Sequence, residues 1–113
     1  MSYKLIPTQT FKDEVYQLIK KYPSIKSDLK DLSVILKNNP KAGNALGSNA
    51  YKIRIKNSDS GKGKRSGYRI ITYVSDPKMV VWLLTIYSKS RKTSITDQEL
   101  SRIINKADFD NLP

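Results

Sequence analysis

Positively charged side chains recur at every second position in the segment Tyr-Lys-Ile-Arg-Ile-Lys, near the middle of the chain. Lys52, Arg54 and Lys56 alternate there with Ile53 and Ile55, which is the period-2 pattern of a strand with one buried face. The two isoleucines would point into a core, and the three cations would share the other face. Because a row of like charges repels itself, such a face is stable only when water or a polyanion screens it. The pattern therefore indicates a surface suited to an anion.

More cations follow in the next segments of the chain. Arg69 lies in the next strand-like segment, and Lys89, Arg91 and Lys92 follow the one after it. Four tyrosines accompany them: Tyr51, Tyr68, Tyr73 and Tyr87. If the strand faces agree, cations and rings share one surface, as in proteins that pair phosphates with Lys or Arg and stack bases on aromatic rings. The alternation alone leaves two interpretations open, an interface for single-stranded nucleic acid and an ordinary solvated sheet face.

The glycine-rich segment Gly-Lys-Gly-Lys-Arg-Ser at 61–66 adds three cations, Lys62, Lys64 and Arg65. A mononucleotide-binding P-loop needs G-x-x-x-x-G-K-S/T between a strand and a helix, whereas this segment has a different spacing and precedes a strand. We therefore predict a basic hairpin loop, whose glycines let the backbone approach nucleic-acid phosphates closely.

The composition narrows the possible chemistry. The 113 residues include 21 Lys and Arg against 10 Asp and Glu, a formal charge of +11, which favours nucleic acid, an anionic surface or an acidic protein as partner. Cysteine and histidine are both absent, which excludes disulfides, thiolate metal sites and the usual neutral-pH acid–base group. No metal or cofactor is expected. The longest apolar run, at 79–84, is too short to span a bilayer, so we expect no membrane association and a cytoplasmic location.

The acidic side chains fit structural positions better than catalytic ones. Asp97 and Glu99 lie where a helix start favours acids. The other helical acids fall on the predicted polar sides of helices: Asp13, Glu14, Asp28 and Asp31. No pair of them is spaced for metal binding or glycosidic chemistry.

The hydrophobic pattern predicts one α+β domain over residues 1–113, with an antiparallel sheet core packed against an N-terminal helical hairpin and a C-terminal helix. The predicted order is β-α-α-β-β-β-α. Strands are expected at 3–6, 51–56, 67–74 and 79–87, and the last three should form a meander. The Pro, Gly and Asn residues at 40–50 indicate a loop.

Three helix starts are predicted from capping residues. Thr8 or Thr10 caps the first helix, and Ser24 caps the second. Thr96 and Glu99 form a capping box at the start of the last helix.

Four segments carry a resemblance to a known family: Tyr51-Lys-Ile-Arg-Ile, Gly67-Tyr68-Arg69-Ile-Ile-Thr-Tyr, Leu84-Thr-Ile-Tyr-Ser-Lys-Ser and Ile95-Thr-Asp-Gln-Glu-Leu. In order and spacing they resemble the RelE/ParE superfamily of bacterial toxins, nearest its RelE and HigB-like branches, over nearly the whole chain. The resemblance implies the toxin of a type II toxin–antitoxin system, bound by a cognate acidic antitoxin. In the RelE branch it implies an mRNA interferase, a metal-independent endoribonuclease that inhibits translation by cleaving mRNA on the ribosome.

The resemblance also implies the residues of the site. The two basic positions of the family's second strand fall on Lys52 and Arg54, and the arginine of its Gly-Tyr-Arg falls on Arg69. A basic residue after the last strand falls on Lys89 or Arg91. We predict Lys52 as the general base, with its pKa lowered by neighbouring cations. Arg54 and Arg69 would stabilise the phosphate, and Lys89 or Arg91 would act as the acid or as a further clamp.

Other residues are predicted to contact RNA or the ribosome: Lys56, Lys62, Lys64, Arg65, Tyr68, Tyr87 and Lys92. The tyrosine that RelE carries on its last helix falls on Thr96 in this chain. That departure leaves the orientation of the substrate base, or a proton transfer, without the family's ring.

Two other functions remain open from the sequence. The ParE branch poisons DNA gyrase without cutting RNA, although it generally lacks the basic cluster. A non-catalytic nucleic-acid-binding module would have the same basic face without the chemistry. The sequence also leaves open whether an antitoxin covers the basic face or displaces the last helix.

Overall fold

The computed structural model of the protein describes residues 3–60, 67–89 and 95–107. Within these ranges the chain forms three helices and one sheet of five strands. Their bounds in chain order are β1 Lys4–Pro7, α1 Gln9–Ile19, α2 Ile25–Asn38, β2 Asn44–Gly47, β3 Ala50–Ile55, β4 Tyr68–Ser75, β5 Val80–Ser88 and α3 Asp97–Lys106. None of these helices is both long and apolar enough to cross a membrane.

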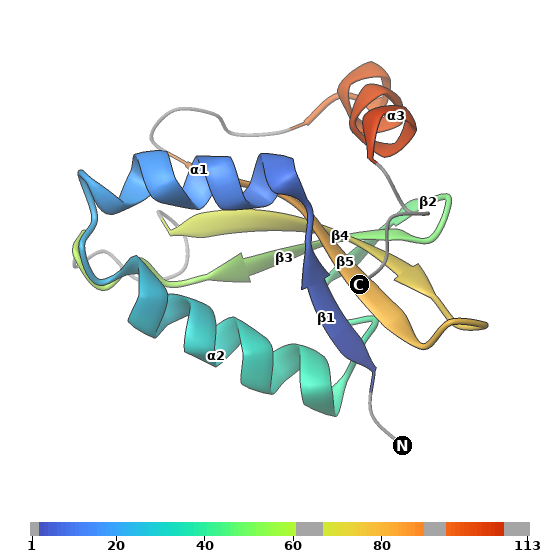
Figure 1. The fold of residues 1–113 in the computed structure, drawn as a ribbon, viewed down its shortest axis with the longest axis horizontal. Coiled ribbons are helices and arrows are strands. Elements are labelled where there is room, and N and C mark those ends of the chain that lie inside the picture. The colour runs from blue at the N-terminus through green and yellow to red at the C-terminus, as the bar shows by residue number, and fades with distance from the viewer. Residues whose placement is uncertain (1–2, 61–66, 90–94, 108–113) are drawn as a thin grey trace.

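The sheet has the strand order β1-β5-β4-β3-β2 (Figure 1). Neighbouring strands from β2 to β5 pair antiparallel, so the predicted α+β fold with an antiparallel meander is confirmed. Strand β1 joins the outer edge of β5 in the same direction, which makes the sheet as a whole mixed. Strand β4 is therefore central, with a neighbour on each side.

The predicted loop at 40–50 is wrong in part, because strand β2 lies within it. β2 pairs with the start of β3. The turn between them contains Gly47, Ser48 and Asn49, with φ angles of 88°, 53° and 65°. Left-handed backbone at consecutive residues is a property of tight hairpin turns and favours Gly and Asn. The residues that indicated a loop therefore build a hairpin turn.

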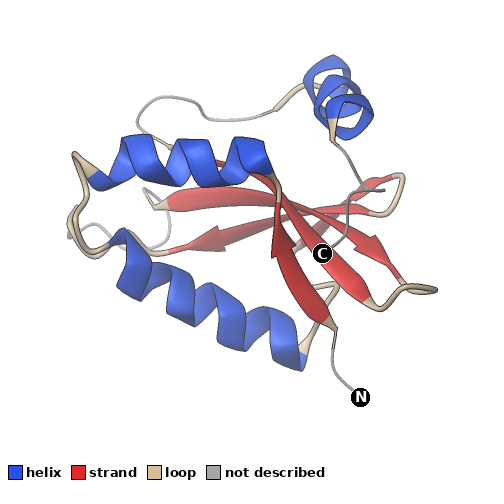
Figure 2. Ribbon diagram, viewed as in Figure 1, coloured by secondary structure: helices blue, strands red, loops and turns tan. Residues whose placement is uncertain are grey.

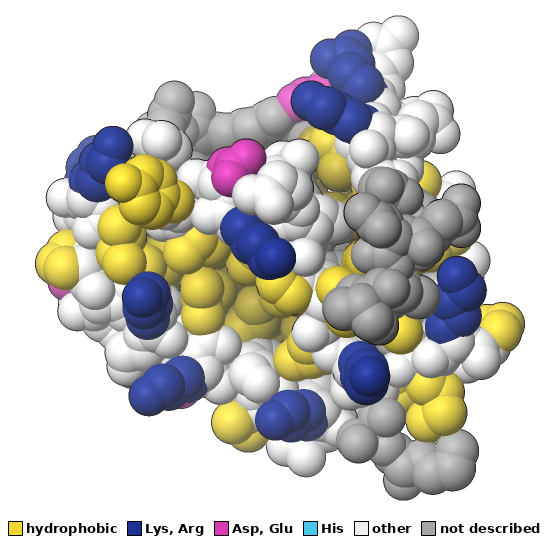
Figure 3. Space-filling model, viewed as in Figure 1, with side chains coloured by type: hydrophobic (Ala, Val, Ile, Leu, Met, Phe, Trp, Pro, Cys, Tyr) yellow, Lys and Arg dark blue, Asp and Glu magenta, His cyan; other side chains and the backbone are white. Residues whose placement is uncertain are grey.

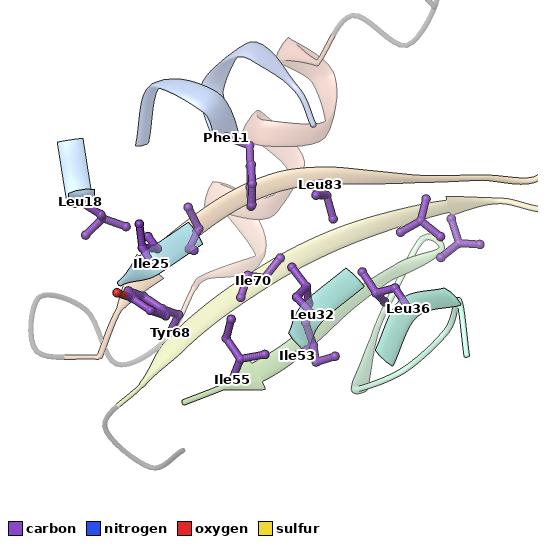
Figure 4. Close-up of a cluster of buried hydrophobic side chains, with 13 residues drawn as sticks. Phe11, Leu18, Ile25, Leu32, Leu36, Ile53, Ile55, Tyr68, Ile70 and Leu83 are labelled. Atoms are coloured by element: carbon purple, nitrogen blue, oxygen red, sulfur yellow. The ribbon is translucent and has the colours of Figure 1, made fainter. Parts of the chain in front are cut away.

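Helices α1 and α2 form the predicted hairpin and cover one face of the sheet (Figure 2). Phe11 and Leu18 of α1 are buried, as are Ile25, Leu32 and Leu36 of α2, at the spacing of an apolar helix stripe. These side chains pack against β3, β4 and β5 in one hydrophobic cluster (Figure 4). The main core thus lies between the hairpin and the sheet.

The two helix starts of the hairpin differ. At α1, the Thr8 hydroxyl accepts a hydrogen bond from the Phe11 backbone N–H at 3.2 Å, so Thr8 is the cap. Ser24 precedes α2 as predicted, but its side chain makes no capping bond. Its backbone N–H donates instead to Oδ2 of Asp59 at 2.9 Å, which ties the start of α2 to the segment that follows β3.

Helix α3 packs on the opposite face of the sheet. Leu100 is buried there in a second cluster with Ala50, Ile71, Trp82 and Leu84. The predicted capping box at the start of α3 is confirmed, because both of its hydrogen bonds are present. Figure 1 shows α3 apart from the helical hairpin, and its cluster partners place it on the other face of the sheet.

Asp28 does not lie on a solvated side of α2, as the sequence indicated, because the residue is 2% exposed. Its Oδ2 accepts a hydrogen bond from the Ser58 backbone N–H at 3.0 Å, and its Oδ1 accepts one from the Ser58 hydroxyl. The neighbouring Asn57 is also buried, and its Oδ1 accepts from the Asp59 backbone N–H at 2.9 Å. Asp28 therefore anchors the segment after β3 to the first turn of α2.

We expect Asp28→Ala to lower the free energy of unfolding by about 1–3 kcal/mol, because it removes two hydrogen bonds to a buried carboxylate. Asp31→Ala is the matched control, because Asp31 lies on the same helix and is exposed; its free energy of unfolding should stay within about 0.5 kcal/mol of the wild type. Urea denaturation followed by circular dichroism measures both. Equal midpoints for the two variants would contradict the anchoring role.

Candidate nucleic-acid interface

Strand register brings the predicted cations of β3 and β4 onto one face of the sheet. Arg54 is the Cα partner of Arg69, and Arg69 is the Cα partner of Tyr87 on β5. Directly paired residues share a face, and residues two apart on one strand share it too, so Lys52 lies beside Arg54. We call the surface of Lys52, Arg54, Arg69 and Tyr87 the basic face. It is the face that also carries α3, whereas Ile53 packs under the helical hairpin.

Arg69 is the buried member of the basic face. It is 3% exposed, while Arg54 opposite it is exposed and Lys52 is half-buried. Burial lowers the pKa of the Arg69 guanidinium, the Arg54 charge lowers it further, and Tyr87 acts in the opposite direction. Like charges directly opposite each other on adjacent strands destabilise a sheet. The sheet therefore holds two mutually repelling arginines at its centre, one of them out of water.

Gly67 allows β3 and β4 to lie close together at this end of the basic face. A Cβ at Gly67 would lie 2.0 Å from the backbone oxygen of Ile55, so any larger residue would push β3 away from β4. The Gly67 carbonyl also accepts hydrogen bonds from the Lys89 backbone N–H at 3.1 Å and, at a long 3.5 Å, from Nη1 of Arg69. Lys89 is thereby held at the same end of the sheet as Arg69.

The predicted site residues fall into three groups. Lys52, Arg54, Arg69 and Lys89 lie on the basic face or at its end, and Lys56 is exposed just after β3. Five predicted residues lie outside the described ranges: Lys62, Lys64, Arg65, Arg91 and Lys92. Tyr68 differs from expectation, and Tyr87 matches it only in place.

The prediction that Tyr68 contacts RNA is wrong. Tyr68 is 0% exposed, and its ring lies in the main core (Figure 4). The ring is edge-on to that of Tyr22, with the ring centroids 5.9 Å apart. Burial raises the pKa of the Tyr68 hydroxyl above the usual tyrosine value. Because side chains alternate along β4, the neighbour of Arg69 must point to the helical side. Tyr87, in contrast, is half-buried on the basic face.

Thr96 supplies a helix cap at the position where the resemblance to RelE would place a tyrosine. Its hydroxyl accepts a hydrogen bond from the Glu99 backbone N–H at 3.1 Å. The side chain is therefore already used to begin α3, and it offers no ring to a base.

Positive charge alone does not distinguish the basic face from the rest of the surface. On the helical side of the molecule, Lys and Arg side chains lie around a band of hydrophobic side chains over α1 and α2 (Figure 3). Among the described residues, Arg69 is the one buried Lys or Arg; buried cations are rare in proteins, and perturbed charged groups cluster at functional sites. Within the described ranges, no three acidic side chains lie close enough together to hold a metal ion.

Sequence reasoning missed Glu14, which lies at the border of the basic face. Its carboxylate accepts from the Thr85 hydroxyl at 2.7 and 2.9 Å and from the Ile86 backbone N–H at 3.2 Å. A groove of about 400 Å³ between α1 and β5 is lined by Glu14, Ile86 and Tyr87, among others. Glu14 lies on the side of α1 that faces β5. The hydrophobic periodicity of α1 does not distinguish this position from a solvent-exposed one.

Comparison with solved structures identifies the fold. A double arginine-to-alanine mutant of the E. coli toxin RelE in the free state superposes with a TM-score of 0.61 at 21% identity, over 94% of this chain and 98% of that one. The chain has the RelE fold. The same mutant bound to a peptide of the antitoxin RelB gives a TM-score of 0.59 at 22% identity, over 90% of this chain and 94% of that one. No family model matches the sequence.

We expect Arg54→Gln to raise the free energy of unfolding by about 0.2–1 kcal/mol, the range of cross-strand pair energies, because it removes the charge opposite Arg69. The gain should shrink as salt is added, since salt screens the repulsion. Lys30→Gln, at an exposed position of α2, controls for the loss of one positive charge from the whole protein. Thermal unfolding at low and high salt measures both variants. A loss of stability in Arg54→Gln would show that the two arginines do not oppose each other.

Proposed function

We propose that this protein is the toxin of a type II toxin–antitoxin system and that it cleaves mRNA on the ribosome without a metal ion. The observation that carries the proposal is the burial of Arg69 directly opposite Arg54, with Lys52 beside them. A site that stabilises charge developing on a phosphate needs fixed cations in a place where water is excluded. The RelE fold, which this chain shares with the E. coli toxin RelE, supports the same assignment.

The chemistry follows from the residue types on the basic face. The 2′-oxygen of the substrate attacks the adjacent phosphorus, and the bond from phosphorus to the 5′-oxygen of the next nucleotide breaks. Lys52 takes the proton of the 2′-hydroxyl, for which it must be neutral. Lys89 or Arg91 gives a proton to the departing 5′-oxygen or clamps it. Since the chain has no histidine, lysine is the basic side chain best suited to accept the proton.

The two central arginines have electrostatic roles. A guanidinium stays protonated and is therefore a poor base. Arg54, which is exposed, would meet the incoming phosphate, and Arg69, beside it on β4, would stabilise the additional negative charge of the pentacoordinate phosphorus. Arg69 needs little reorganisation during the reaction, because it is buried in the central strand and its guanidinium donates to the Gly67 carbonyl.

The proposed partners follow from charge and from the likeness to RelE. A formal charge of +11 suits the RNA of the ribosome as well as an acidic antitoxin. The RelE mutant has been solved with an antitoxin peptide, and we propose an acidic antitoxin encoded beside this protein as its cognate partner. Both interactions would take place in the cytoplasm.

The proposal predicts that the wild type cuts a defined mRNA within the codon in the ribosomal A site, in a reconstituted translation reaction. Lys52→Ala should slow single-turnover cleavage by roughly 10²–10⁴-fold if Lys52 is the general base. Arg69→Ala should slow it by roughly 10²–10³-fold, the usual effect of removing one donor that stabilises a developing anion. Lys30→Ala removes a lysine from the helical side and should cut at the wild-type rate.

Other outcomes would favour other functions. Intact mRNA together with an arrest of DNA replication would indicate a gyrase poison. Binding of mRNA without cleavage would indicate a nucleic-acid-binding module. Full cleavage by Lys52→Ala would remove Lys52 from the mechanism while leaving the endonuclease assignment in place.

A further inference from the structure

Strand β5 loses its outer neighbour half-way along its length. Strand β1 pairs with residues Val80 to Leu83 and no further. Beyond that point, side chains of α1 and of its cap take over the edge. Thr8 donates from its hydroxyl to the carbonyls of Leu83 and Leu84 at 3.0 and 3.1 Å. Glu14 then accepts hydrogen bonds from Thr85 and Ile86. Thr8 and Glu14 thus make, in succession, the hydrogen bonds that a neighbouring strand would otherwise make with this edge of β5.

An irregularity in β5 makes the second of these contacts critical. Leu83 pairs with Thr72 and Thr85 pairs with Ile71, which leaves Leu84 as an extra residue. After such a bulge the strand can resume in more than one register, and a slip of one residue turns every later side chain to the other face. The first two residues after the bulge are those that bond to Glu14.

We propose that Glu14 is a positioning residue for the basic face: by holding Thr85 and Ile86 it fixes the register of β5 after the bulge, and so it keeps Tyr87 beside Arg69. This inference rests on the proposed function, because the face that it orders is the proposed catalytic face. Glu14 itself needs no contact with the substrate.

The consequence of losing Glu14 follows from what surrounds Arg69. Tyr87 is the Cα partner of Arg69 on the side away from Arg54, and Tyr87 opposes the lowering of the Arg69 pKa. Lys89 follows two residues later and is bonded to Gly67. If the end of β5 moved, the buried guanidinium would lose its fixed neighbour and the basic end of the strand would shift with it. Small displacements of catalytic groups lower the rate more than they lower binding.

Two substitutions of Glu14 distinguish the effect of its hydrogen bonds from the effect of its negative charge. Glu14→Gln keeps an oxygen that can accept from the Ile86 N–H and an amide that can donate to the Thr85 hydroxyl, but it has no negative charge. If Glu14 positions the strand, Glu14→Gln should cut mRNA within about threefold of the wild type, while Glu14→Ala should lose roughly tenfold to a hundredfold in kcat with little change in KM. If Glu14 instead acted as an acid or base, both variants would lose activity to the same degree, which would overturn the proposal.

Thr8→Val provides the matched control for a purely structural effect. It removes hydrogen bonds from the same strand edge and the cap of α1, but these bonds reach only Leu83 and the bulge residue Leu84, and none reaches the residues after the bulge that bond to Glu14. We expect it to lower the melting temperature at least as much as Glu14→Ala while keeping the wild-type kcat well below that temperature. A proportional loss of kcat in both variants would show that Glu14 contributes only to stability. Thr85→Val, which removes one of the Glu14 bonds, extends the test with a smaller expected loss of kcat if Glu14→Ala does not fold.

Amide NMR spectra of the free protein distinguish a failure of this inference from a failure of the proposed function. In Glu14→Ala the Tyr87 amide and the Arg69 Nε–H resonances should move, whereas in Glu14→Gln and Thr8→Val they should stay near their wild-type positions. Unchanged resonances in Glu14→Ala would overturn the positioning role even if mRNA cleavage is confirmed. If the resonances of Glu14→Ala shift but the wild type cuts no RNA, the positioning role stands and the proposed function is wrong.

Discussion

The organisation of this structure depends on keeping a guanidinium out of water beside a second one. Arg69 lies in the central strand with almost no exposure, and the Arg54 charge faces it from the neighbouring strand. Burial and the Arg54 charge both disfavour the charged form of the Arg69 guanidinium. The rest of the fold must supply the free energy that keeps it there. It does so through the two hydrophobic clusters on either side of the sheet, which bury most of the side chains of β4 and β5.

The two faces of strand β4 serve different purposes: one packs into the hydrophobic core, and the other carries Arg69 of the proposed catalytic face. Tyr68 and Ile70 point into the core under the helical hairpin, while Arg69 and Ile71 point to the other side. The apolar face holds the strand rigidly, so the arginine between two core residues has little freedom to move. Ile71, beneath α3, closes the apolar end of the same face. The basic face is thus built on a rigid element, which favours precise placement of functional groups.

The parts of the structure that depend on local patterns could be predicted from the sequence. Alternation in β3 gave the buried and basic faces, and capping residues gave the start of α3. The errors concern contacts between segments far apart in the chain. Helix periodicity placed Asp28 and Glu14 on solvated sides of their helices. In the structure, Asp28 accepts hydrogen bonds from a loop residue 30 positions away and Glu14 from a strand residue 71 positions away. Tyr68 was misplaced because aromatic content, rather than its odd–even relation to Arg69, was used to assign its face.

The repulsion that weakens the free protein can strengthen its interaction with a polyanion. In the absence of a ligand, Arg54 and Arg69 raise the free energy of the folded state by their mutual repulsion. A phosphate placed on the exposed Arg54 would screen that repulsion and restore a favourable environment to the buried charge of Arg69 on the neighbouring strand. Binding of an anion and stability of the fold are then linked, because any group that binds the folded protein alone stabilises it by mass action. An acidic protein segment over the basic face would use the same linkage as an RNA phosphate. In this way one pair of arginines can make the free protein less stable and favour both of its proposed partners.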